Sequence, residues 1–337
     1  MEFEPRFLRE ATGFADQIRA LATTVKNEDG FGAFDEQTLL NLDSVGAAEY
    51  LLITTDGDPA AGEPQAESGP HSQSETGEGT VVGAAIRDVR NGNVELAVAP
   101  SHRSRGLGRR LLRAARERFA GSSLWAHGTL PPAQVLAETE GLTATRSLLV
   151  MTRPLVGVVN RSDLENAIPN WSIRPIDPEA DLEVFTSLNE AAFANHPEQG
   201  QLTIDDMRQR FSQDWFDPEL LLLVHPKHTD DQNDIADGAS MSVSVAAANG
   251  FNGDKPLAFL WLKPQSKTVV ELYVLGVHPK IQGQGLGGTL SDLMLKIMRS
   301  HGFQQAILYV DLDNEPAVRS YRRAGFDVSE THTQYDL

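Results

Sequence analysis

The sequence predicts an α/β (α+β) protein that consists of two similar halves. Its 337 residues are long for one domain and favour two. Hydrophobic residues make up 40% of the chain and charged residues 23%, so each half has enough apolar side chains to build a core. The most informative observation is an internal repeat, because an apolar strand, a glycine-rich turn and an amphipathic helix occur once in each half.

The two copies of this repeat align at a glutamate in the strand and at Gly-Leu-Gly in the turn. Residues 94–108 and residues 270–287 both begin with Val-Glu-Leu, and in both a proline follows the strand. The spacing of the apolar residues predicts a helix and then another strand after each turn. The predicted helices are 107–119 and 286–299, and the predicted strands that follow them are 124–126 and 306–310.

Composition excludes several classes of partner and site. The net charge of −18 disfavours nucleic acid, because a polyanion repels phosphate backbones. The chain has no cysteine, which excludes disulfides, thiolate metal sites and a cysteine nucleophile. His225 and His228 lie in a polar segment, so no metal site is predicted.

The sequence predicts neither a signal peptide nor a membrane span. Residues 1–5 are acidic, whereas a signal peptide begins with a basic and then an apolar stretch. No window reaches the roughly 18 apolar residues of a membrane span. We therefore expect a cytoplasmic monomer that does not bind membranes.

Two polar segments predict insertions. Residues 55–80 are rich in Gly, Pro, Ser and Glu, and residues 225–256 begin with a long polar run. Neither can bury enough apolar surface to offset chain entropy, so both are predicted to be disordered hairpin loops, with functional loops as the alternative. The predicted domains are residues 1–154 and 172–337, and residues 155–171 are the predicted linker between them.

A strand, a glycine-rich turn and a helix start can form an anion site, since glycines let the backbone approach and the first helical N–H groups are free. Residues 283–288 match the G-x-G-x-x-G of dinucleotide-binding loops, and Asp311 lies near the expected acidic position. However, residues 278–281 separate the strand from the turn, and the sister loop 103–108 lacks the first glycine. Both halves share Gln/Arg-x-x-Gly-x-Gly. A purely structural turn stays open as an alternative for either copy.

This shared pattern resembles the pyrophosphate loop of the GNAT superfamily of N-acetyltransferases. The second half also resembles the superfamily in the pattern Asn-x-x-Ala-x-x-x-Tyr-x-x-x-Gly-Phe, which runs from Asn314 to Phe326. The resemblance implies two tandem domains, each with a mixed, mostly antiparallel sheet flanked by helices, and acetyl-CoA as the co-substrate. In this fold the strand before the turn separates from its neighbour and binds the pantetheine arm through its main chain.

The resemblance also implies which residues bind acetyl-CoA. In the second half they are Leu275, Gly276, Val277, Gln282, Gly283, Gln284, Gly285, Leu286, Gly287, Gly288, Asn314, Glu315, Pro316, Ala317, Val318 and Arg319. The matching positions in the first half are Leu96, Ala97, Val98, Ser104, Arg105, Gly106, Leu107, Gly108 and Arg109. The first half has Ala137 where the tyrosine of the pattern should be, so we predict that it is catalytically silent.

Four further motifs, residues 125–130, 189–200, 215–218 and 271–277, resemble the mycothiol synthases, a tandem GNAT family that acetylates the cysteinyl amine of cysteinyl-glucosaminyl-inositol. By this resemblance, the small-molecule amine contacts Glu36, Glu198, Lys263, Glu271 and Tyr309. The carboxylates suit an ammonium group and sugar hydroxyls, and the lysine suits sugar oxygens. From the sequence alone, the carboxylates of residues 36 and 198 fit a solvated surface better than a substrate site, and the lysine fits a charge at a strand end as well as it fits a substrate contact.

Two residues have the chemical roles in this interpretation. Glu271 is predicted to act as the general base through a water, because a carboxylate with a pKa of about 4.3 is a weak direct base. Strand alternation predicts that it shares a face with Tyr273 and Leu275. Tyr321 is predicted to protonate the departing thiolate, and the N–H of Val277 to polarise the thioester carbonyl. Without the motifs, a strand-end carboxylate and a core aromatic remain the alternatives.

Three other functions stay open at this point. A tandem acetyltransferase could act on another small amine, such as an aminoglycoside, polyamine or peptide amine. The chain could also be an acetyl-CoA-binding module without turnover, which the presence of both Glu271 and Tyr321 disfavours. A nicotinamide-dependent oxidoreductase is the third choice.

Overall fold

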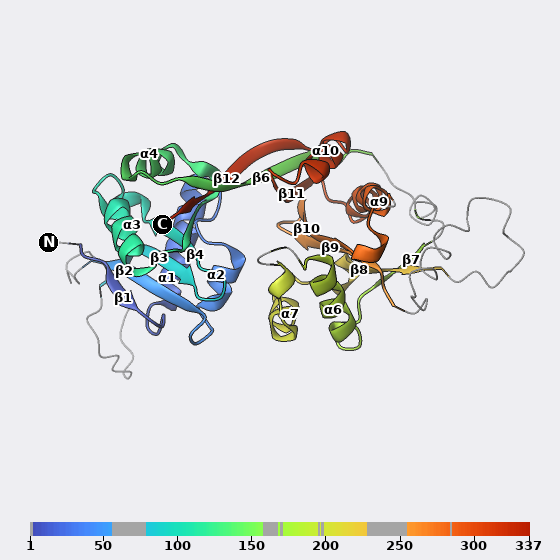
Figure 1. The fold of residues 1–337 in the computed structure, drawn as a ribbon, viewed down its shortest axis with the longest axis horizontal. Coiled ribbons are helices and arrows are strands. Elements are labelled where there is room, and N and C mark those ends of the chain that lie inside the picture. The colour runs from blue at the N-terminus through green and yellow to red at the C-terminus, as the bar shows by residue number, and fades with distance from the viewer. Residues whose placement is uncertain are drawn as a thin grey trace, which may run out of the picture. The chain divides into compact units, whose positions relative to one another are not determined.

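The computed structural model describes residues 3–55, 79–157, 168, 171–194, 196, 199–227, 255–283 and 285–337. They form two compact units (Figure 1). Unit 1 consists of Met1–Leu148 and Glu330–Leu337, and unit 2 consists of Leu149–Ser329.

Unit 1 has a sheet with helices on both faces. Its strands are β1 (Arg6–Leu8), β2 (Ala48–Thr54), β3 (Val81–Asp88), β4 (Asn93–Val98) and β5 (Ser123–Ala126), with the end of β12 (Asp327–Asp336) as the last strand. Its helices are α1 (Ala15–Asp29), α2 (Glu36–Asn41), α3 (Leu107–Arg118) and α4 (Pro131–Glu140), and its 3-10 helices are η1 (Pro100–His102) and η2 (His127–Thr129).

The strand order in unit 1 is β1-β2-β3-β4-β5-β12. The β4–β5 pair is parallel, and the β1–β2, β2–β3, β3–β4 and β5–β12 pairs are antiparallel. Residues of β2 alternate between two cores: Tyr50 and Leu52 pack with α1, whereas Leu51 and Ile53 pack with α3. The two helices therefore cover opposite faces of the sheet, as the period-two pattern requires.

Unit 2 repeats this plan. Its strands are β7 (Trp171–Pro175), β8 (Leu221–Pro226), β9 (Ala258–Pro264), β10 (Val269–Val277) and β11 (Gln305–Asp311), with part of β6 (Ala144–Pro154). Its helices are α6 (Leu182–Ala192), α7 (Ile204–Phe211), α9 (Leu286–Ser300) and α10 (Glu315–Arg323), and its 3-10 helices are η3 (Gln199–Gln201), η4 (Pro218–Leu220) and η5 (Pro279–Ile281).

The strand order in unit 2 is β6-β11-β10-β9-β8-β7. The β10–β11 pair is parallel, and the β7–β8, β8–β9 and β9–β10 pairs are antiparallel. Leu260 and Leu262 of β9 pack in one core with α9, whereas Phe259 and Trp261 pack in the other with α6 and α7. Each unit thus has a mixed, mostly antiparallel sheet flanked by helices, which confirms the predicted fold class.

The extents of the two units differ from the predicted domains. The second domain was predicted to run to residue 337, but residues 330–337 belong to unit 1. The reason is that Thr333–Asp336 of β12 pair with Ser123–Ala126 of β5. Of the predicted insertions, residues 56–78 and 228–254 lie outside the described residues, as does most of the predicted linker 155–171.

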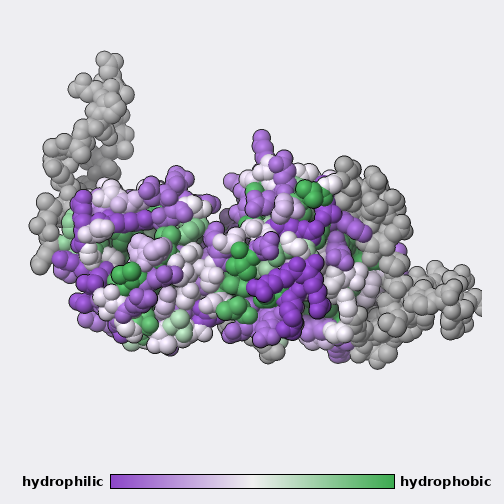
Figure 2. Space-filling model, turned by 90° about the horizontal axis from the view of Figure 1, so that it is seen from above, coloured by the Kyte–Doolittle hydropathy of each residue, from purple (hydrophilic) through white to green (hydrophobic). Residues whose placement is uncertain are grey.

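One face of each unit can be seen with its side chains in Figure 2. Figure 2 shows polar residues over most of the visible face of each unit, and hydrophobic residues reach this face in small patches. Within the described part of the chain, no helix combines the length and the apolar character that crossing a membrane requires.

Candidate active site

β10 separates from β11 halfway along its length. The β10–β11 pairing begins at Val269↔Gln305 and ends at Leu272↔Leu308, whereas the pairing of β10 with β9 continues to Val277↔Ala258. On the β11 side, the main chain of residues 274–277 therefore has no strand partner among the described strands. Main-chain N–H and C=O groups require partners, so this edge can bind an extended ligand as another strand would.

Unit 1 has the same separation. The β4–β5 pairing ends at Glu95↔Trp125, but the β3–β4 pairing continues to Gly83↔Val98. Leu96, Ala97 and Val98, the predicted cofactor-binding residues of this strand, lie beyond the point of separation. The internal repeat in the sequence thus corresponds to a repeat of the open strand edge.

A β-bulge at Tyr273 changes the faces of β10. Its register with β9 shifts between Leu272 and Val274, which leaves Tyr273 as the extra residue. As a result, Tyr273 and Val274 both pack with the α6 and α7 core, whereas Leu275 packs with the α9 core. The prediction that Leu275 shares the face of Glu271 and Tyr273 is wrong, because simple alternation does not continue through a bulge.

The glycine loop follows the open edge of β10. The Gln282 side chain donates its Nε2–H to the carbonyl oxygen of Val277 at 2.8 Å and so ties the loop to the end of the strand. Gly283 and Gly285 have φ angles of 77° and 85°, which L side chains rarely adopt. A Cβ atom added at Gly283, Gly285, Gly287 or Gly288 would meet nothing within 4 Å. Gln284 lies outside the described residues.

This open glycine surface is at the start of α9, and Leu286, its first residue, is buried. Gly285 is the N-cap, and no side chain caps the helix. The first N–H groups of a 15-residue helix therefore face the loop. Free amides, a helix dipole and a surface without side chains together suit a diphosphate.

The loop of unit 1 has the same geometry with other residues. Arg103 replaces the glutamine and donates its Nε–H to the carbonyl oxygen of Val98 at 3.1 Å. Ser104 has a φ angle of 60° where unit 2 has glycine, and Gly106 has one of 80° at the N-cap of α3. Of the other predicted residues in this loop, Leu107 is buried, Arg105 is exposed, Gly108 lies against Leu136, and Arg109 pairs with Glu140.

The predicted residues of α10 have different local roles. The Asn314 side chain accepts the N–H of Ala317 at 3.3 Å and caps the helix. Val318 is buried in the unit 2 core, whereas Glu315 and Arg319 form an exposed ion pair, and Pro316 occupies the first turn. Any contact of Val318 with the co-substrate must therefore come from its main chain.

Tyr321 lies on α10 against the α9 core. It is half-buried, and its ring lies 6.0 Å from that of Phe326 in an edge-on arrangement. Burial raises the pKa of Tyr321, because the charged phenolate loses its solvation. The phenol is therefore protonated at neutral pH, which is the form that a proton donor needs.

Glu271 and Lys263 are direct neighbours across β10 and β9. Glu271 is 7% exposed, and its Oε2 accepts a hydrogen bond from Gln265 Nε2 at 2.5 Å. The Lys263 Nζ lies 4.4 Å from the ring centre of Trp215 and 5.0 Å from that of Tyr273. A cation over two aromatic faces is stabilised and held in one place.

Sequence reasoning missed the residues around Lys263. The Tyr273 hydroxyl accepts a hydrogen bond from Nε of Arg210, which is 6% exposed, at 3.1 Å. Trp215, which stacks under the lysine, is part of a motif recognised in the sequence but was not predicted as a site residue. The aromatic run at residues 215–216 was the only feature of the sequence that could have indicated Trp215. The contact between α7 and β10 joins distant segments, and one sequence does not reveal it.

The remaining predicted acceptor residues are not brought together by one unit. Tyr309 is on β11 beyond its last pair with β10 and is 43% exposed. Glu36 is the first residue of α2 in unit 1 and is half-buried. Glu198 lies outside the described residues. Within the residues that the structure describes, no group of three His, Cys, Asp or Glu could hold a metal ion.

Comparisons with known proteins identify this arrangement. A profile of the acetyltransferase (GNAT) family matches residues 204–326, and a profile of the acetyltransferase (GNAT) domain matches residues 73–141. Mycothiol acetyltransferase from Beutenbergia cavernae is 36% identical and is aligned over 97% of this chain and 96% of its own. The enzyme of that name from Kineococcus radiotolerans is 37% identical, with 95% and 92% covered. The chain belongs to the mycothiol acetyltransferase family.

Its members are acetyl-CoA-dependent N-acetyltransferases, which confirms the predicted family and enzyme class.

Solved structures agree on the fold. A GCN5-related N-acetyltransferase from Sphaerobacter thermophilus has a TM-score of 0.56 at 18% identity, with 98% of this chain and 94% of that chain covered. A tandem GNAT protein from the clavulanic acid biosynthesis pathway has a TM-score of 0.55 at 16% identity, with 99% and 97% covered.

Two glycines of this family member give a matched prediction. A Cβ atom at Gly276 would lie 2.2 Å from Cε1 of the buried Phe259 ring, so Gly276→Ala should destabilise unit 2 by about 1–3 kcal/mol. A Cβ atom at Gly287 meets nothing within 4 Å, so Gly287→Ala should leave stability unchanged or raise it by about 0.5–1 kcal/mol. Denaturant unfolding measures both values, and an equal loss in the two variants contradicts the geometry.

Proposed function

We propose that this enzyme transfers the acetyl group of acetyl-CoA to the cysteinyl amine of desacetylmycothiol, a cysteine joined to glucosamine and inositol, in the last step of mycothiol biosynthesis. The observation that carries the proposal is the position of Glu271, one residue before β10 leaves β11 and directly across from Lys263. A carboxylate and a held cation then lie at the start of the open edge. The mycothiol relatives named above support this choice of acceptor.

Acetyl-CoA binds, in this proposal, along the open edge and the glycine loop. The main chain of Leu275, Gly276 and Val277 pairs with the pantetheine arm, and the amides from Gln282 to Gly288 bind the diphosphate. The free edge, the open glycine surface and the uncapped start of α9 support this assignment. The N–H of Val277 donates to the thioester oxygen and stabilises the oxyanion that forms there.

Glu271 acts as the general base through a water. The acceptor is an α-amine with a pKa of about 7.7–8.0, so it loses its proton with modest assistance. The neutral amine attacks the thioester carbonyl, a C–N bond forms, and the C–S bond breaks. Gln265 orients the Glu271 carboxylate through the 2.5 Å hydrogen bond.

Tyr321 protonates the departing thiolate. A phenol with a pKa raised by burial is a weaker acid than the thiol that it creates, so the transfer depends on positioning rather than on acidity. The packing of the Tyr321 ring against Phe326 supports a fixed position of the hydroxyl.

The acceptor's sugar and inositol are bound by the other predicted residues. Lys263 donates to their oxygens, and its aromatic surroundings support a fixed ammonium group. Tyr309 of unit 2 contributes to the proposed acceptor site, and the contacts of Glu36 and Glu198 with the acceptor stay predictions from the sequence. The first half is silent in this proposal, since Ala137, where the acid should be, is a buried alanine.

The experiment that tests this function is mass spectrometry of the products. Acetyl-CoA and cysteinyl-glucosaminyl-inositol should give an acetylated acceptor and free CoA. Aminoglycosides, polyamines and peptide amines in competition test the rival acetyltransferase functions. Binding of acetyl-CoA without any turnover identifies a binding module, and binding of NAD in its place identifies an oxidoreductase.

Tyr321→Phe should lower kcat by about 10²–10⁴ and change the affinity for acetyl-CoA little, because only the proton is removed. Stopped assays of CoA release measure kcat, and equilibrium binding measures affinity. Tyr335→Phe removes a buried hydroxyl from β12 in unit 1 and is the matched control. Turnover of Tyr321→Phe at the wild-type rate removes Tyr321 as the acid.

Glu271→Gln should lower kcat/KM most below neutral pH. There the amine is largely protonated and needs the base, whereas above about pH 8 it is neutral without help. The ratio of wild-type to variant kcat/KM should therefore fall as the pH rises through that value. Glu183→Gln, at an exposed position of α6, is the control. A ratio that does not change with pH argues against Glu271 as the base.

A further inference from the structure

Three aromatic rings of unit 2 pack against one another next to the ammonium of Lys263. The ring centres of Trp215 and Tyr273, which lie 4.4 Å and 5.0 Å from the Lys263 Nζ, are 5.3 Å apart. Trp261, which is buried two residues before the lysine on β9, lies 5.8 Å from the first ring and 4.9 Å from the second. We call Trp215, Trp261 and Tyr273 the aromatic platform. Because each ring contacts the other two, none turns independently.

Arg210 holds the platform from the side of α7. This guanidinium is buried, and it donates Nε–H to the Tyr273 hydroxyl at 3.1 Å and Nη1–H to the carbonyl oxygen of Asp206 at 3.2 Å. Asp206 is itself fixed, since it forms a capping box with Thr203 at the start of the helix. A buried cation loses much of its stabilisation when it loses an acceptor, so the bond to Tyr273 opposes rotation of that ring.

Trp215 is a costly choice for a residue that only fills space. Its Nε1 is buried and has no hydrogen-bond acceptor among the residues that the structure describes. A buried N–H without an acceptor lowers stability, and a phenylalanine ring does not carry that group. Of the aromatic rings, however, indole attracts a cation most strongly. The residue at this position therefore suits the Lys263 ammonium better than it suits the core.

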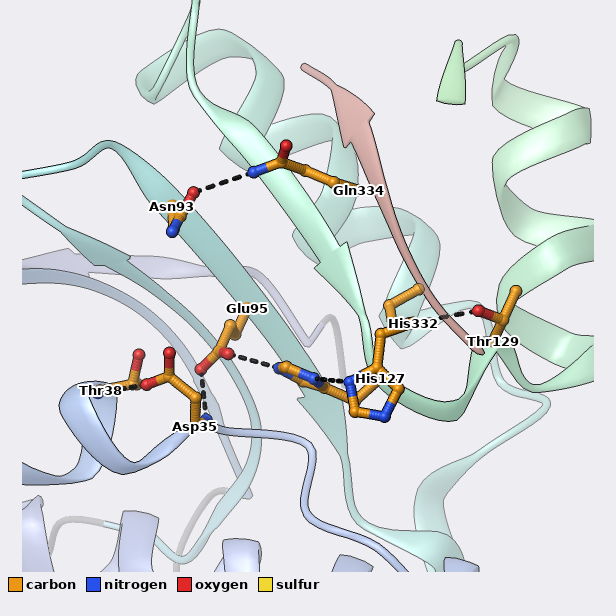
Figure 3. A network of polar contacts seen from close by, with 9 residues as sticks. Asp35, Thr38, Asn93, Glu95, His127, Thr129, His332 and Gln334 are labelled. Atoms are coloured by element: carbon orange, nitrogen blue, oxygen red, sulfur yellow. Dashed lines mark hydrogen bonds and ion pairs between the residues drawn. The ribbon is translucent and has the colours of Figure 1, made fainter. Parts of the chain in front are cut away.

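The repeat in unit 1 lacks the lysine. Glu95 of β4 is the counterpart of Glu271, but the residue across from it on β3 is Ile86. Its Oε1 lies 2.5 Å from Nε2 of His127, and its other carboxylate oxygen accepts the main-chain N–H of Asp35 at 2.9 Å (Figure 3). Unit 1 thus holds this carboxylate with groups other than a lysine on the neighbouring strand.

The repeat in unit 1 also lacks a platform tyrosine. In the aligned strands, Ala97 takes the place of Tyr273. A platform that served only the packing of the sheet would suit both copies of the repeat. Its tyrosine occurs in the copy that has Lys263, which indicates that the platform serves the lysine.

We propose that the aromatic platform and Arg210 position the Lys263 ammonium beside Glu271 and so set the preference of the enzyme for an acceptor with hydroxyl groups beyond its amine. This inference rests on the proposed function, in which the lysine donates to sugar and inositol oxygens. A lysine side chain loses rotamer entropy when it binds a ligand, and the platform removes part of that cost beforehand. An ammonium carries several N–H groups, so from one held position it can bond several oxygens. The positioning residues are Trp215, Tyr273 and Arg210.

Trp215→Leu tests the inference without changing the open strand β10. Losing the indole face should raise the acceptor KM by about tenfold. The kcat and the acetyl-CoA KM should stay within about twofold, because the lysine contact is equally strong before and during the reaction. Trp215→Phe keeps a smaller ring face and should raise the acceptor KM by only about threefold. A fall in kcat with an unchanged acceptor KM overturns the inference.

A truncated acceptor separates positioning from a general loss of structure. Cysteinamide has the amine but no sugar, so it cannot use the lysine contact. Trp215→Leu should lower kcat/KM about tenfold for cysteinyl-glucosaminyl-inositol and leave that for cysteinamide within about twofold. Equal losses for both acceptors overturn the inference. Phe216→Leu is the matched control, since it removes a half-buried ring of the same core that stacks on Phe211, and it should change neither value. An equal rise of the acceptor KM in this control also overturns the inference.

Double variants test whether the platform acts through the lysine. In the Lys263→Met background, Trp215→Leu should raise the acceptor KM no further, because the ammonium that it positions is gone. Tyr273→Phe keeps the ring and removes the bond to Arg210, so it should raise the acceptor KM by about threefold in the wild type and not in Lys263→Met. The same factor in both backgrounds overturns the inference.

Nuclear magnetic resonance of 13C-labelled lysines reports on the platform apart from activity. Ring faces shield nearby protons, so the Cε protons of Lys263 should resonate upfield of those of the other lysines. The signal that is missing from Lys263→Met identifies them, and in Trp215→Leu it should move downfield. A wild-type signal at the position of the other lysines overturns the inference, and this measurement needs no substitution at Trp215.

The two proposals fail in different ways. Wild-type enzyme that does not acetylate cysteinyl-glucosaminyl-inositol overturns the proposed function, and the Lys263 signal then still reports whether the platform holds the ammonium. Lys263→Met without effect on the acceptor KM overturns the contact between the lysine and the acceptor, and with it this inference.

Discussion

The open edge of β10 is the constraint on which unit 2 depends. Main-chain groups at a sheet edge must find partners, and a protein that leaves them to a ligand has to keep neighbouring elements away. The loop after the strand does this with glycines at φ angles of 77° and 85°, and Gln282 bonds the last strand carbonyl from the side. Helix α9 begins at this loop with free N–H groups. A strand end, a loop and a helix start therefore form one continuous main-chain surface.

The bulge at Tyr273 changes which face of the sheet the side chains of β10 point to. Before it, Glu271 is across from Lys263 on β9, and the tyrosine itself lies under the lysine ammonium. After it, Leu275 and Val277 pack with the α9 core. One inserted residue thus separates the carboxylate and the cation from the part of the strand whose edge is open. Gly276 is a consequence of the same geometry, because the Phe259 ring crosses it at the position of a missing side chain.

Much of the fold could be predicted because period and spacing are local properties. The strand, turn and helix of each repeat were predicted to within a few residues. The bulge was not predictable, since an extra residue leaves no mark on the apolar pattern around Tyr273. The assignment of residues 330–337 to unit 1 was not predicted either. It depends on the pairing of β12 with β5, which joins segments about two hundred residues apart and is not visible in one sequence. The Trp215 and Arg210 contacts depend on the same kind of distant packing.

The two glutamates of the repeat indicate how duplicated sheets acquire different roles. Glu271 has Lys263 across the antiparallel pair, but Glu95 has Ile86, an apolar residue, at the same place. A carboxylate buried beside isoleucine must find another partner, and in unit 1 the chain turns into η2 directly after β5 to supply His127. In unit 2 the corresponding strand β11 continues to Asp311 instead, and Tyr309 remains 43% exposed. The same glutamate is therefore a held structural anchor in one sheet and a carboxylate beside an open edge in the other, because the residue across from it differs.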